Sequence, residues 1–316
     1  MLLTGSNLTI DPKLKAENIK RHIRELMDAN SADGITIGLS GGMDSTVLAA
    51  LAVQAIGKNR VYPYHLYDRD SSKESRTKAK LIADWLGIKL KLHDITPEMK
   101  NLKIYSPLIM KITAFSGFIN RHLNSKLHRL FYRQSPFMAT LRKGYPGTGG
   151  ISSFLYNHTV GSIEAAFNAR HICRRKFLEQ LAKEKNWLVL GAANRSELMV
   201  GWFVKDGIDD LPFSPIIGLY KTQIFQLAKY LDLPVQIQNQ APSPDMIKGI
   251  TDESAMGITY DRLDVILDCI DRGLSDQQII SGGIRSKDLL LVRMMNKLSE
   301  WKREKNPDTN VVKSSA

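Results

Sequence analysis

A short apolar run leads directly into a glycine-rich turn in the stretch Gly34-Ile-Thr-Ile-Gly-Leu-Ser-Gly-Gly-Met-Asp-Ser45. The run from Gly34 to Leu39 predicts a buried strand, and the alanine- and leucine-rich residues from Thr46 to Ile56 predict a helix. Glycines let the backbone approach a ligand closely and expose consecutive N–H groups. The positive end of the following helix points into the same space. The turn is therefore predicted to bind an anion of the size of a phosphate.

Strand and helix patterns alternate along the rest of the chain. We predict further strands over residues 61–66, 88–92 and 187–190. We predict further helices over residues 13–29, 72–86, 163–185 and 220–231. This alternation is typical of an α/β protein with a doubly wound parallel sheet and flanking helices. Ligands of such sheets bind at the carboxyl ends of the strands, where the glycine-rich turn would lie.

Composition excludes several classes of protein. The chain has 316 residues, of which 43% are hydrophobic, enough for one large or two small cores. Collagen-like, mucin-like and low-complexity chains do not have this composition. Cys173 and Cys269 are too few for a disulfide framework or a four-cysteine zinc site. The sequence has no apolar stretch long enough for a membrane span and no signal-peptide pattern, so we expect a soluble, cytoplasmic protein.

Positive charge is concentrated in one segment. The chain has 44 Lys and Arg against 32 Asp and Glu, a net charge of +12. Residues 101–160 contain no acidic residue and eight basic ones, which are Lys103, Lys111, Arg121, Lys126, Arg129, Arg133, Arg142 and Lys143. We predict a basic helical insertion over 101–160, and a flexible tail over 304–316. The insertion is either a surface excursion with a solvated basic face or a platform for an anionic partner, such as a phosphate-rich substrate, an acidic carrier protein, RNA or a membrane surface.

The polar residues of the turn suit phosphate chemistry. Ser40 and Ser45 add hydroxyl donors to the backbone N–H groups. Asp44 supplies a carboxylate suited to a magnesium ion that bridges phosphates. No lysine follows the glycines, so the turn is not a Gly-x-x-x-x-Gly-Lys-Ser/Thr loop. The alternative is an ordinary glycine-rich connection between a strand and a helix.

Ser40-Gly-Gly-Met-Asp-Ser45 resembles the pyrophosphate loop of the N-type ATP pyrophosphatases, which cleave ATP to AMP and pyrophosphate while adenylating a substrate. A longer, co-linear resemblance is to the NAD synthase family. It is carried by Leu188-Val-Leu-Gly-Ala-Ala-Asn-Arg-Ser-Glu-Leu198, Gly218-Leu-Tyr-Lys-Thr-Gln223, Leu227-Ala-Lys-Tyr-Leu231, Ala241-Pro-Ser-Pro-Asp245, Thr251-Asp-Glu-Ser-Ala-Met-Gly-Ile-Thr-Tyr260 and Ser299-Glu-Trp-Lys-Arg303. The resemblance covers nearly all of the chain outside the insertion. It implies a single domain over 1–316 with the adenine-nucleotide alpha-hydrolase-like fold.

The resemblance also implies roles for individual residues. The ATP-binding residues would be Gly38, Ser40, Gly41, Gly42, Asp44, Ser45, Lys221 and Ser243. Asp44 and Glu197 would bind Mg²⁺, and Asp44, Lys221 and Lys205 would be catalytic. A cation and a lysine can stabilise the negative charge that gathers on departing pyrophosphate. The alternatives are a surface carboxylate for Glu197 and a solvated lysine for Lys221. Family members similar to this chain are homodimers, so we expect a homodimer.

The sequence departs from the family where the acceptor, deamido-NAD, binds. An expected arginine is replaced by Ala166, an aspartate by Pro212 and a histidine by Trp301. The Lys-Tyr-Gly-Asp stretch of the family reads Lys205-Asp-Gly-Ile208, whereas the only change that stands out on the ATP side is Ala192 for a threonine. Each lost polar contact that leaves a partner unpaired costs about 1–3 kcal/mol. We therefore expect a different acceptor, in a pocket that the insertion helps to rebuild; Lys205 and Lys302 persist.

The function predicted from this resemblance is that of an ATP-dependent amide-forming ligase. The carboxylate of a small substrate would be adenylated with release of pyrophosphate, and ammonia would then displace AMP. Ammonia would come from solution or from a separate glutaminase protein. One alternative is an enzyme with the same loop that transfers sulfur or nitrogen to a nucleic acid or a modified base. Another is an ATP-binding relic that serves as an interaction module.

Overall fold

The computed structural model describes residues 5–110, 135–142, 158, 160–243 and 251–303. Four strands form one parallel sheet, with the bounds β1 Gly34–Gly38, β2 Val61–Tyr67, β3 Lys91–Asp94 and β4 Trp187–Leu190. Their order in the sheet is β3-β2-β1-β4. The predicted α/β fold with a parallel sheet is confirmed.

Strand β1 lies inside the sheet, between β2 and β4. Ile35 is paired with Val61 of β2 on one side and with Leu188 of β4 on the other. The chain therefore leaves β1 toward β2 and β3 and returns later on the opposite side. The order of the strands reverses at β1, and open α/β sheets bind their ligands at such a reversal, beyond the carboxyl ends of the strands.

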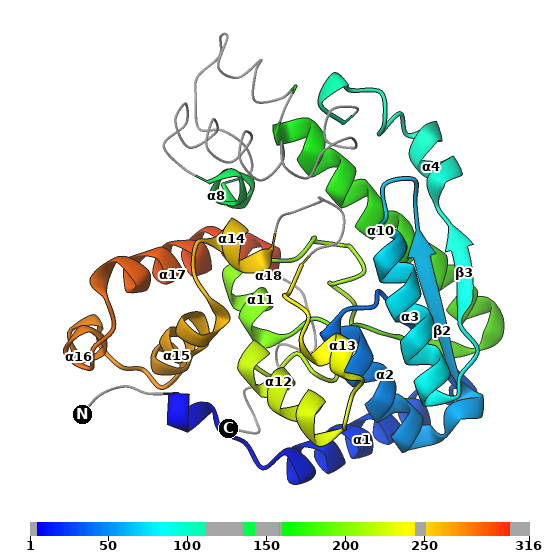
Figure 1. The fold of residues 1–316 in the computed structure, drawn as a ribbon, viewed down its shortest axis with the longest axis horizontal. Helices are drawn as coiled ribbons and strands as arrows, with labels where there is room; N and C mark the ends of the chain where they lie inside the picture. The colour runs from blue at the N-terminus through cyan, green and yellow to red at the C-terminus, as the bar shows by residue number, and fades with distance from the viewer. Residues whose placement is uncertain (1–4, 111–134, 143–157, 159, 244–250, 304–316) are drawn as a thin grey trace.

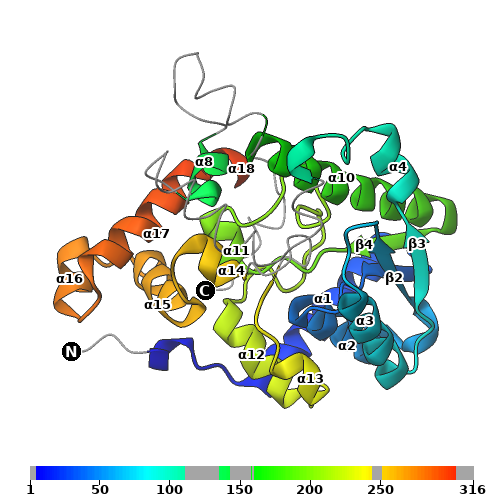
Figure 2. The same ribbon diagram turned by 45° about the horizontal axis from the view of Figure 1, so that its top comes forward.

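Helices cover both faces of the sheet, as a doubly wound fold requires. The helices of this part are α1 Pro12–Ala29, α2 Met43–Ile56, α3 Lys73–Leu86, α4 Thr96–Asn101, α10 Val160–Lys185, α12 Lys221–Tyr230 and α13 Val235–Gln238. Ile35 and Ile37 of β1 share a core with the inner faces of α1 and α2. Leu178 of α10 packs with Tyr64 and Leu66 of β2 in a separate core. Figure 2 shows α10 on one side of the strands and α1–α3 on the other.

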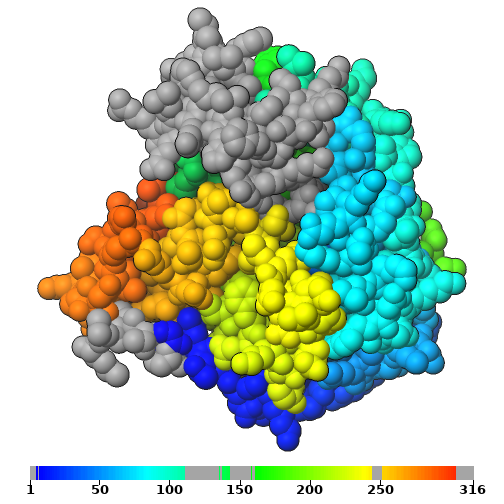
Figure 3. Space-filling view, viewed as in Figure 1, coloured from blue at the N-terminus to red at the C-terminus, as the bar shows by residue number. Residues whose placement is uncertain are grey.

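A second group of helices packs beside the sheet. These helices are α8 Pro136–Leu141, α11 Arg195–Val200, α14 Asp252–Met256, α15 Tyr260–Asp271, α16 Asp276–Ser281, α17 Ser286–Leu298 and α18 Glu300–Arg303, and short 3₁₀ turns lie at Gly5–Leu8 and Lys58–Arg60. Tyr260, Leu263 and Val292 lie at the centre of their shared core. Figure 1 shows α8 next to α14 and α17, and in Figure 3 the yellow segment around α13 lies between these orange helices and the cyan part of the sheet domain.

A buried ionic network holds α10 against the end of β2. Asp68, which directly follows β2, accepts hydrogen bonds from Arg170 Nε at 2.5 Å and from the Tyr105 hydroxyl at 2.8 Å. Arg170 Nη2 also binds Asp70 at 2.6 Å. Burial raises the pKa of Asp68, but the charge and hydrogen bond of Arg170, the Tyr105 hydrogen bond and the charge of Arg174 together outweigh burial and lower the pKa overall. A charged pair of this kind is costly to break, because either partner alone would remain buried without compensation.

The third strand begins later than the sequence predicts. Residues 88–92 were expected to form it, but β3 begins at Lys91, paired with Tyr64. Gly87 ends α3 in the left-handed conformation, and Ile88 N donates to Ala83 O. The residues after Gly87 therefore still complete the end of the helix and cannot join the sheet. Helix α2 begins at Met43 rather than at Thr46, which places Asp44 in its first turn.

Two predicted segments lie largely outside the described residues. Of the insertion predicted over 101–160, the structure describes residues 101–110, the α8 region at 135–142, and residues 158 and 160. The tail predicted over 304–316 lies entirely outside them. In the described part of the chain, no helix has both the length and the apolar character that crossing a membrane requires.

Candidate functional site

The turn after β1 has a backbone shape that only glycine adopts without strain. Gly41 has φ +88°, and a Cβ atom there would lie 2.6 Å from the Ser75 carbonyl oxygen. Gly42 is the N-cap residue of α2, with an extended conformation and no side-chain cap. The first N–H groups of α2 therefore have no partner in their own helix and point toward the space beside the turn. This is the geometry expected of an anion site.

The two serines of the turn are held to each other and to the backbone. Ser40 Oγ lies 3.1 Å from Ser45 Oγ and accepts from Gly42 N at 3.1 Å. The Ser45 hydroxyl donates to Gly42 O at 3.1 Å, and Thr46 Oγ1 donates to the same carbonyl at 2.7 Å. The hydroxyl groups of the turn therefore hold its backbone in one conformation. An anion could bind there without reorganisation of the turn.

A lysine and two carboxylates meet next to this turn. Lys221 is the first residue of α12, and its Nζ donates to Asp44 Oδ2 of α2 and to Glu197 Oε1 of α11, the latter at 3.2 Å. Asn194 links the two carboxylate-bearing helices, since its amide donates to Asp44 Oδ1 at 2.9 Å and its Oδ1 caps Glu197 N at 3.0 Å. The three helix starts α2, α11 and α12 thus converge on one point. The residues predicted as metal ligands and as a catalytic lysine lie in direct contact.

The charges of this cluster depend on burial. Burial is the main reason that the pKa of Glu197 rises to about 8, with the charges of Asp44 and Asp252 adding to the rise and Lys221 opposing it. Burial favours a neutral Lys221, but Asp44 and Glu197 outweigh it and raise the Lys221 pKa above its usual value. Lys221 is therefore charged at neutral pH, whereas Glu197 titrates near it. A further positive charge beside Glu197 would favour its ionised form.

Two acidic residues that were not predicted individually complete the surroundings. Asp252 is 5% exposed, its Oδ2 accepts from the Tyr260 hydroxyl at 3.1 Å, and its Oδ1 has no hydrogen-bond partner among the described residues. Asp264 is fully buried, accepts from Ser196 Oγ at 2.5 Å and from Thr222 N at 2.8 Å, and has a pKa raised by burial to about 6. Asp252 lies in the quoted stretch Thr251 to Tyr260, which could have drawn attention to it. Asp264 sits on a helix with no such motif, so only its burial reveals it.

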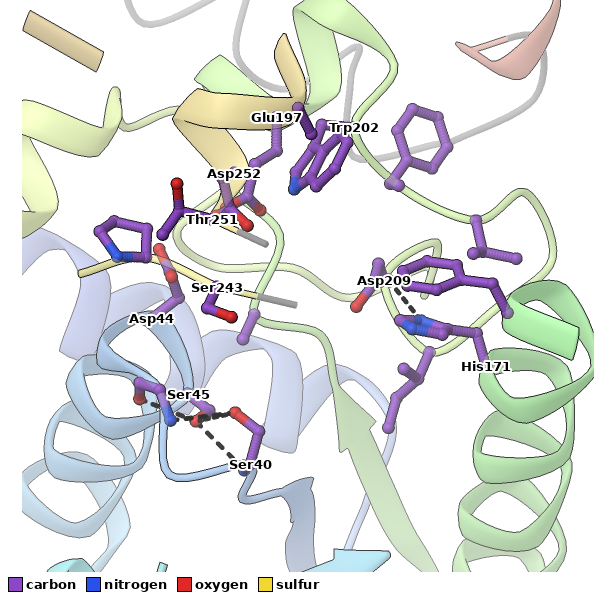
Figure 4. A pocket seen from close by; sticks show the side chains of 18 of the residues that line it. Ser40, Asp44, Ser45, His171, Glu197, Trp202, Asp209, Ser243, Thr251 and Asp252 are labelled. Atoms are coloured by element: carbon purple, nitrogen blue, oxygen red, sulfur yellow. Dashed lines mark hydrogen bonds and ion pairs between the residues drawn. The ribbon is translucent and has the colours of Figure 1, made fainter. Parts of the chain in front are cut away.

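A cavity of about 1550 Å³ with two sides lies beside the lysine and its two carboxylates (Figure 4). The turn side is lined by Ser40, Gly41, Gly42, Asp44, Ser45, Glu197, Lys221, Ser243 and Asp252. The α8 side is lined by Phe137 and Met138 of α8, Phe167, His171 and Arg174 of α10, Asp209 and Lys302. Figure 4 shows Ser40, Asp44 and Ser45 grouped apart from His171 and Asp209, with Glu197 and Trp202 above them.

Most of the predicted site residues line the cavity, but the predicted catalytic residue Lys205 is not among the described lining residues. Gly38 and the other predicted ATP-binding residues all line it, including Ser243, the last described residue before a gap. The Nζ of Lys205 donates to the Lys302 carbonyl at 3.0 Å. Lys302 does line it, with its Nζ bound to the carbonyls of Gly201 at 2.9 Å and Phe203 at 2.6 Å. Burial lowers the Lys302 pKa to about 8.

The residues that replace expected acceptor contacts have other roles in the structure. Ala166 is 1% exposed, and Trp301 Nε1 donates to the Leu141 carbonyl at the end of α8 at 3.0 Å. Neither cysteine is among the described lining residues of the cavity; Cys269 is buried, and Cys173 is half-buried. The described residues contain no group of three or more His, Cys, Asp or Glu side chains arranged to hold a metal ion.

The parallel sheet, the glycine-rich turn at its reversal point and the lysine–carboxylate cluster define an α/β nucleotide-binding protein with a site for phosphate chemistry. The sequence model for NAD synthase matches residues 15–113 and 152–306. NH(3)-dependent NAD(+) synthetase of Thermotoga maritima is 32% identical over 295 residues, which cover 93% of this chain and 98% of the relative. That of Thermotoga neapolitana is 34% identical over 83% of this chain and 86% of its own length.

A solved structure of NMN synthetase from Francisella tularensis has a TM-score of 0.68 at 24% identity, covering 94% of this chain and 98% of its own. The fold is therefore that of an NAD synthetase-like protein, as predicted. The chain belongs to the NAD synthase family. It is an ATP-dependent ligase with NH3-dependent NAD synthetase-like activity, which forms a carbon–nitrogen bond and produces AMP and pyrophosphate. Residues 114–151, which include α8, lie outside the match to the family.

Proposed function

We propose that the protein adenylates the carboxylate of a small acceptor other than deamido-NAD and converts it to an amide with ammonia. The observation that carries the ATP-cleaving half is the contact of Lys221 with both Asp44 and Glu197, directly beside the N-terminus of α2. This places one fixed positive charge and two carboxylates where a helix start and a glycine turn can bind phosphates.

The residues of the turn side would divide the work on ATP. The N–H groups of the turn and of the start of α2 would bind the phosphates, with Gly41 keeping that surface open. Lys221, which is charged at neutral pH, would stabilise the pyrophosphate as it departs. The carboxylate oxygen of the acceptor would attack the α-phosphorus of ATP, and ammonia would then attack the acyl carbon with loss of AMP.

We assign Mg²⁺ to Asp44 and Glu197. Both carboxylates reach the same ammonium of Lys221, so a single cation near that point could contact both. Mg²⁺ is usually held by one or two carboxylates together with waters and substrate phosphates, and two hard oxygen donors fit that pattern. The unpartnered Oδ1 of Asp252 adds a further acceptor close to the cluster. Bound there, the cation would neutralise negative charge on the phosphates.

The α8 side supports the proposal of a different acceptor. Phe137 and Met138 of α8 line the cavity although α8 lies outside the family match. Trp301, in place of an expected histidine, uses its ring N–H to hold the end of α8 instead of facing a polar ligand. Ala166 offers no polar group, and Lys205 is held by a main-chain carbonyl. The apolar side chains of α8 and the anchored Lys302 on this wall suit an acceptor smaller than a dinucleotide.

Several further features belong to the same proposal. The nitrogen would come from free ammonia or from a separate glutaminase, and the protein would act as a homodimer in the cytoplasm. The basic residues within 101–160 would face an anionic partner.

The proposal is tested with ATP, Mg²⁺, ammonium and a panel of three acceptors: deamido-NAD, nicotinic acid mononucleotide and nicotinate. Pyrophosphate release and amide formation are measured for each. We expect one of the two smaller acceptors to support a higher kcat/KM than deamido-NAD. A preference for deamido-NAD would contradict the different acceptor but not the ligase. No acceptor-dependent pyrophosphate release with any of the three would contradict an acceptor of this class.

A further inference from the structure

A histidine–aspartate pair lies in the cavity away from the lysine–carboxylate cluster. His171 Nδ1 and Asp209 Oδ2 are 2.6 Å apart, and both residues line the cavity. His171 belongs to α10, whereas Asp209 comes from the connection after α11, so the fold brings them together from separate parts of the chain. None of the roles described so far uses either side chain.

The surroundings of His171 fix the orientation of its ring. The residue is 8% exposed, and its ring stacks on Phe167, one turn earlier in α10, with centroids 4.7 Å apart and an angle of 22°. The backbone carbonyl of His171 accepts from Ile208 N at 3.1 Å, which also ties the helix to the Asp209 segment. Asp209 Oδ2 is the ion-pair partner of Nδ1, and no hydrogen bond to Nε2 is found among the described residues. Nε2 is therefore the ring nitrogen left for a ligand in the cavity.

The charges around the pair keep Asp209 ionised. Burial raises the pKa of Asp209, but the charge and hydrogen bond of His171, followed by the charges of Arg174 and Lys302, outweigh burial and lower it. An ionised carboxylate on Nδ1 favours the tautomer that carries the proton at Nδ1 and leaves Nε2 as a proton acceptor. Asp209 also contributes to the raised pKa of Glu197, so its charge is felt at the turn side. The pair and the cluster line the same cavity.

We propose, building on the proposed ligase function, that His171 is the base of the amide-forming step, with Asp209 as its positioning residue. Ammonium, the main form of this amine at neutral pH, would give one proton to Nε2 and attack as ammonia. The C–N bond forms while the C–O bond to AMP breaks, and its electron pair stays on the AMP phosphate oxygen. The second nitrogen proton passes to water as the amide forms. Ammonium would therefore bind on the α8 side of the cavity.

The two half-reactions allow a direct test. Acceptor-dependent exchange of labelled pyrophosphate into ATP reports adenylation and needs no nitrogen, whereas amide formation needs both steps. Both are measured with the acceptor of the panel above that gives the fastest exchange. For His171→Asn we expect exchange within about twofold of the unmodified enzyme and amide formation lowered about 100-fold, the scale of general base catalysis. For Asp209→Asn we expect amide formation lowered about tenfold with exchange retained.

Hydroxylamine distinguishes proton removal from a structural role. Its nitrogen is mostly unprotonated at neutral pH, so it needs no base before it attacks. The His171→Asn variant should therefore form the hydroxamate within about fivefold of the unmodified rate, although it uses ammonium poorly. His93→Asn is a matched control, because His93 also stacks on a phenylalanine of α10, Phe177, at 3.7 Å but is not among the described lining residues.

The outcomes separate the possible failures. Amide formation from ammonium within threefold of normal in His171→Asn would overturn the role of His171. An equal loss of exchange and amide formation, or an equal loss with ammonium and hydroxylamine, would also overturn it, because His171 would then serve acceptor binding or folding. If the unmodified enzyme shows no acceptor-dependent exchange, the proposed function itself is overturned, and this base with it.

Discussion

The turn side and the α8 side of the cavity are built from different kinds of structure. On the turn side, Asp44, Glu197 and Lys221 each occupy the first turn of a helix, next to a strand end or a cap. On the α8 side, the lining comes from a short helix outside the family match, from the middle of α10 and from a connection. Helix starts fix charged groups for phosphate chemistry, whereas connections and insertions can change the shape of a pocket without disturbing the sheet. In the proposed function, phosphate chemistry and acceptor choice would thus be carried by separate parts of the chain.

The largest effect should follow from removing a charge on the turn side. Asp44→Asn keeps the shape of the side chain but removes one of the two carboxylates that contact Lys221. We expect pyrophosphate exchange to fall about 1000-fold, the scale of losing an electrostatic contact in the transition state. Asp84→Asn is a matched control, since Asp84 also pairs with a lysine, Lys80, but is 64% exposed and far along α3 from the turn. If Asp44→Asn kept a pyrophosphate exchange rate within tenfold of normal, the role of Asp44 in Mg²⁺ binding and ATP cleavage would be contradicted.

A glycine of the turn should be the next most sensitive position. Gly41→Ala would place a Cβ atom 2.6 Å from the Ser75 carbonyl at φ +88°. Relieving the clash must shift the turn, so we expect the KM for ATP to rise about 100-fold and stability to fall by about 1–3 kcal/mol. Gly57→Ala has φ +84° with no atom within 4 Å of the added Cβ and should cost stability alone. Equal KM values for ATP in the two variants, by steady-state kinetics, would contradict the role of the turn.

A substitution on the α8 side should change the KM for the acceptor rather than the KM for ATP. Phe137→Leu removes an edge-to-face contact with Trp202, with centroids 4.8 Å apart, and changes the cavity wall. A contact of this kind is worth about 0.5–1.5 kcal/mol, so we expect the KM for the acceptor to rise about fivefold while the KM for ATP stays constant. Leu108→Ala, at a side chain that is 72% exposed, serves as the control. A change in the KM for ATP instead would show that the two sides are not independent.

The smallest effect on activity and the clearest effect on stability are expected at Asp264. Its pKa is about 6 in the folded protein against 3.8 in the unfolded chain, so the folded state binds the proton more tightly. This group therefore makes the protein less stable as pH rises from about 4 to 6. Asp264→Asn should remove that part of the slope in chemical unfolding experiments between pH 4 and 6, with kcat reduced less than threefold. An unchanged slope would mean that Asp264 does not titrate in this range.

The sequence was sufficient for the sheet and for most of the turn side, because both depend on local patterns. The run before Gly38, the glycines and Asp44 lie within a dozen residues, and Glu197 and Lys221 lie in motifs that follow family order. Asp264 is buried because α15 packs against the segments that carry Ser196 and Thr222. No local sequence pattern predicts this packing. The His171–Asp209 pair joins residues 38 positions apart through the position of α10 over the sheet. The start of β3 was placed three residues too early, because the cap at Gly87 continues the geometry of the helix.

The ion pairs of Arg170 have a consequence for the residue that follows it. Asp68 and Asp70 bind the guanidinium directly beyond β2, and Tyr105 donates a hydrogen bond to Asp68 shortly before the stretch outside the family match. These ion pairs therefore restrict the movement of the next residue, His171, relative to the sheet. Such an anchor would hold the proposed base in place when the residues outside the family match change, so the preferred substrate could change without moving that base.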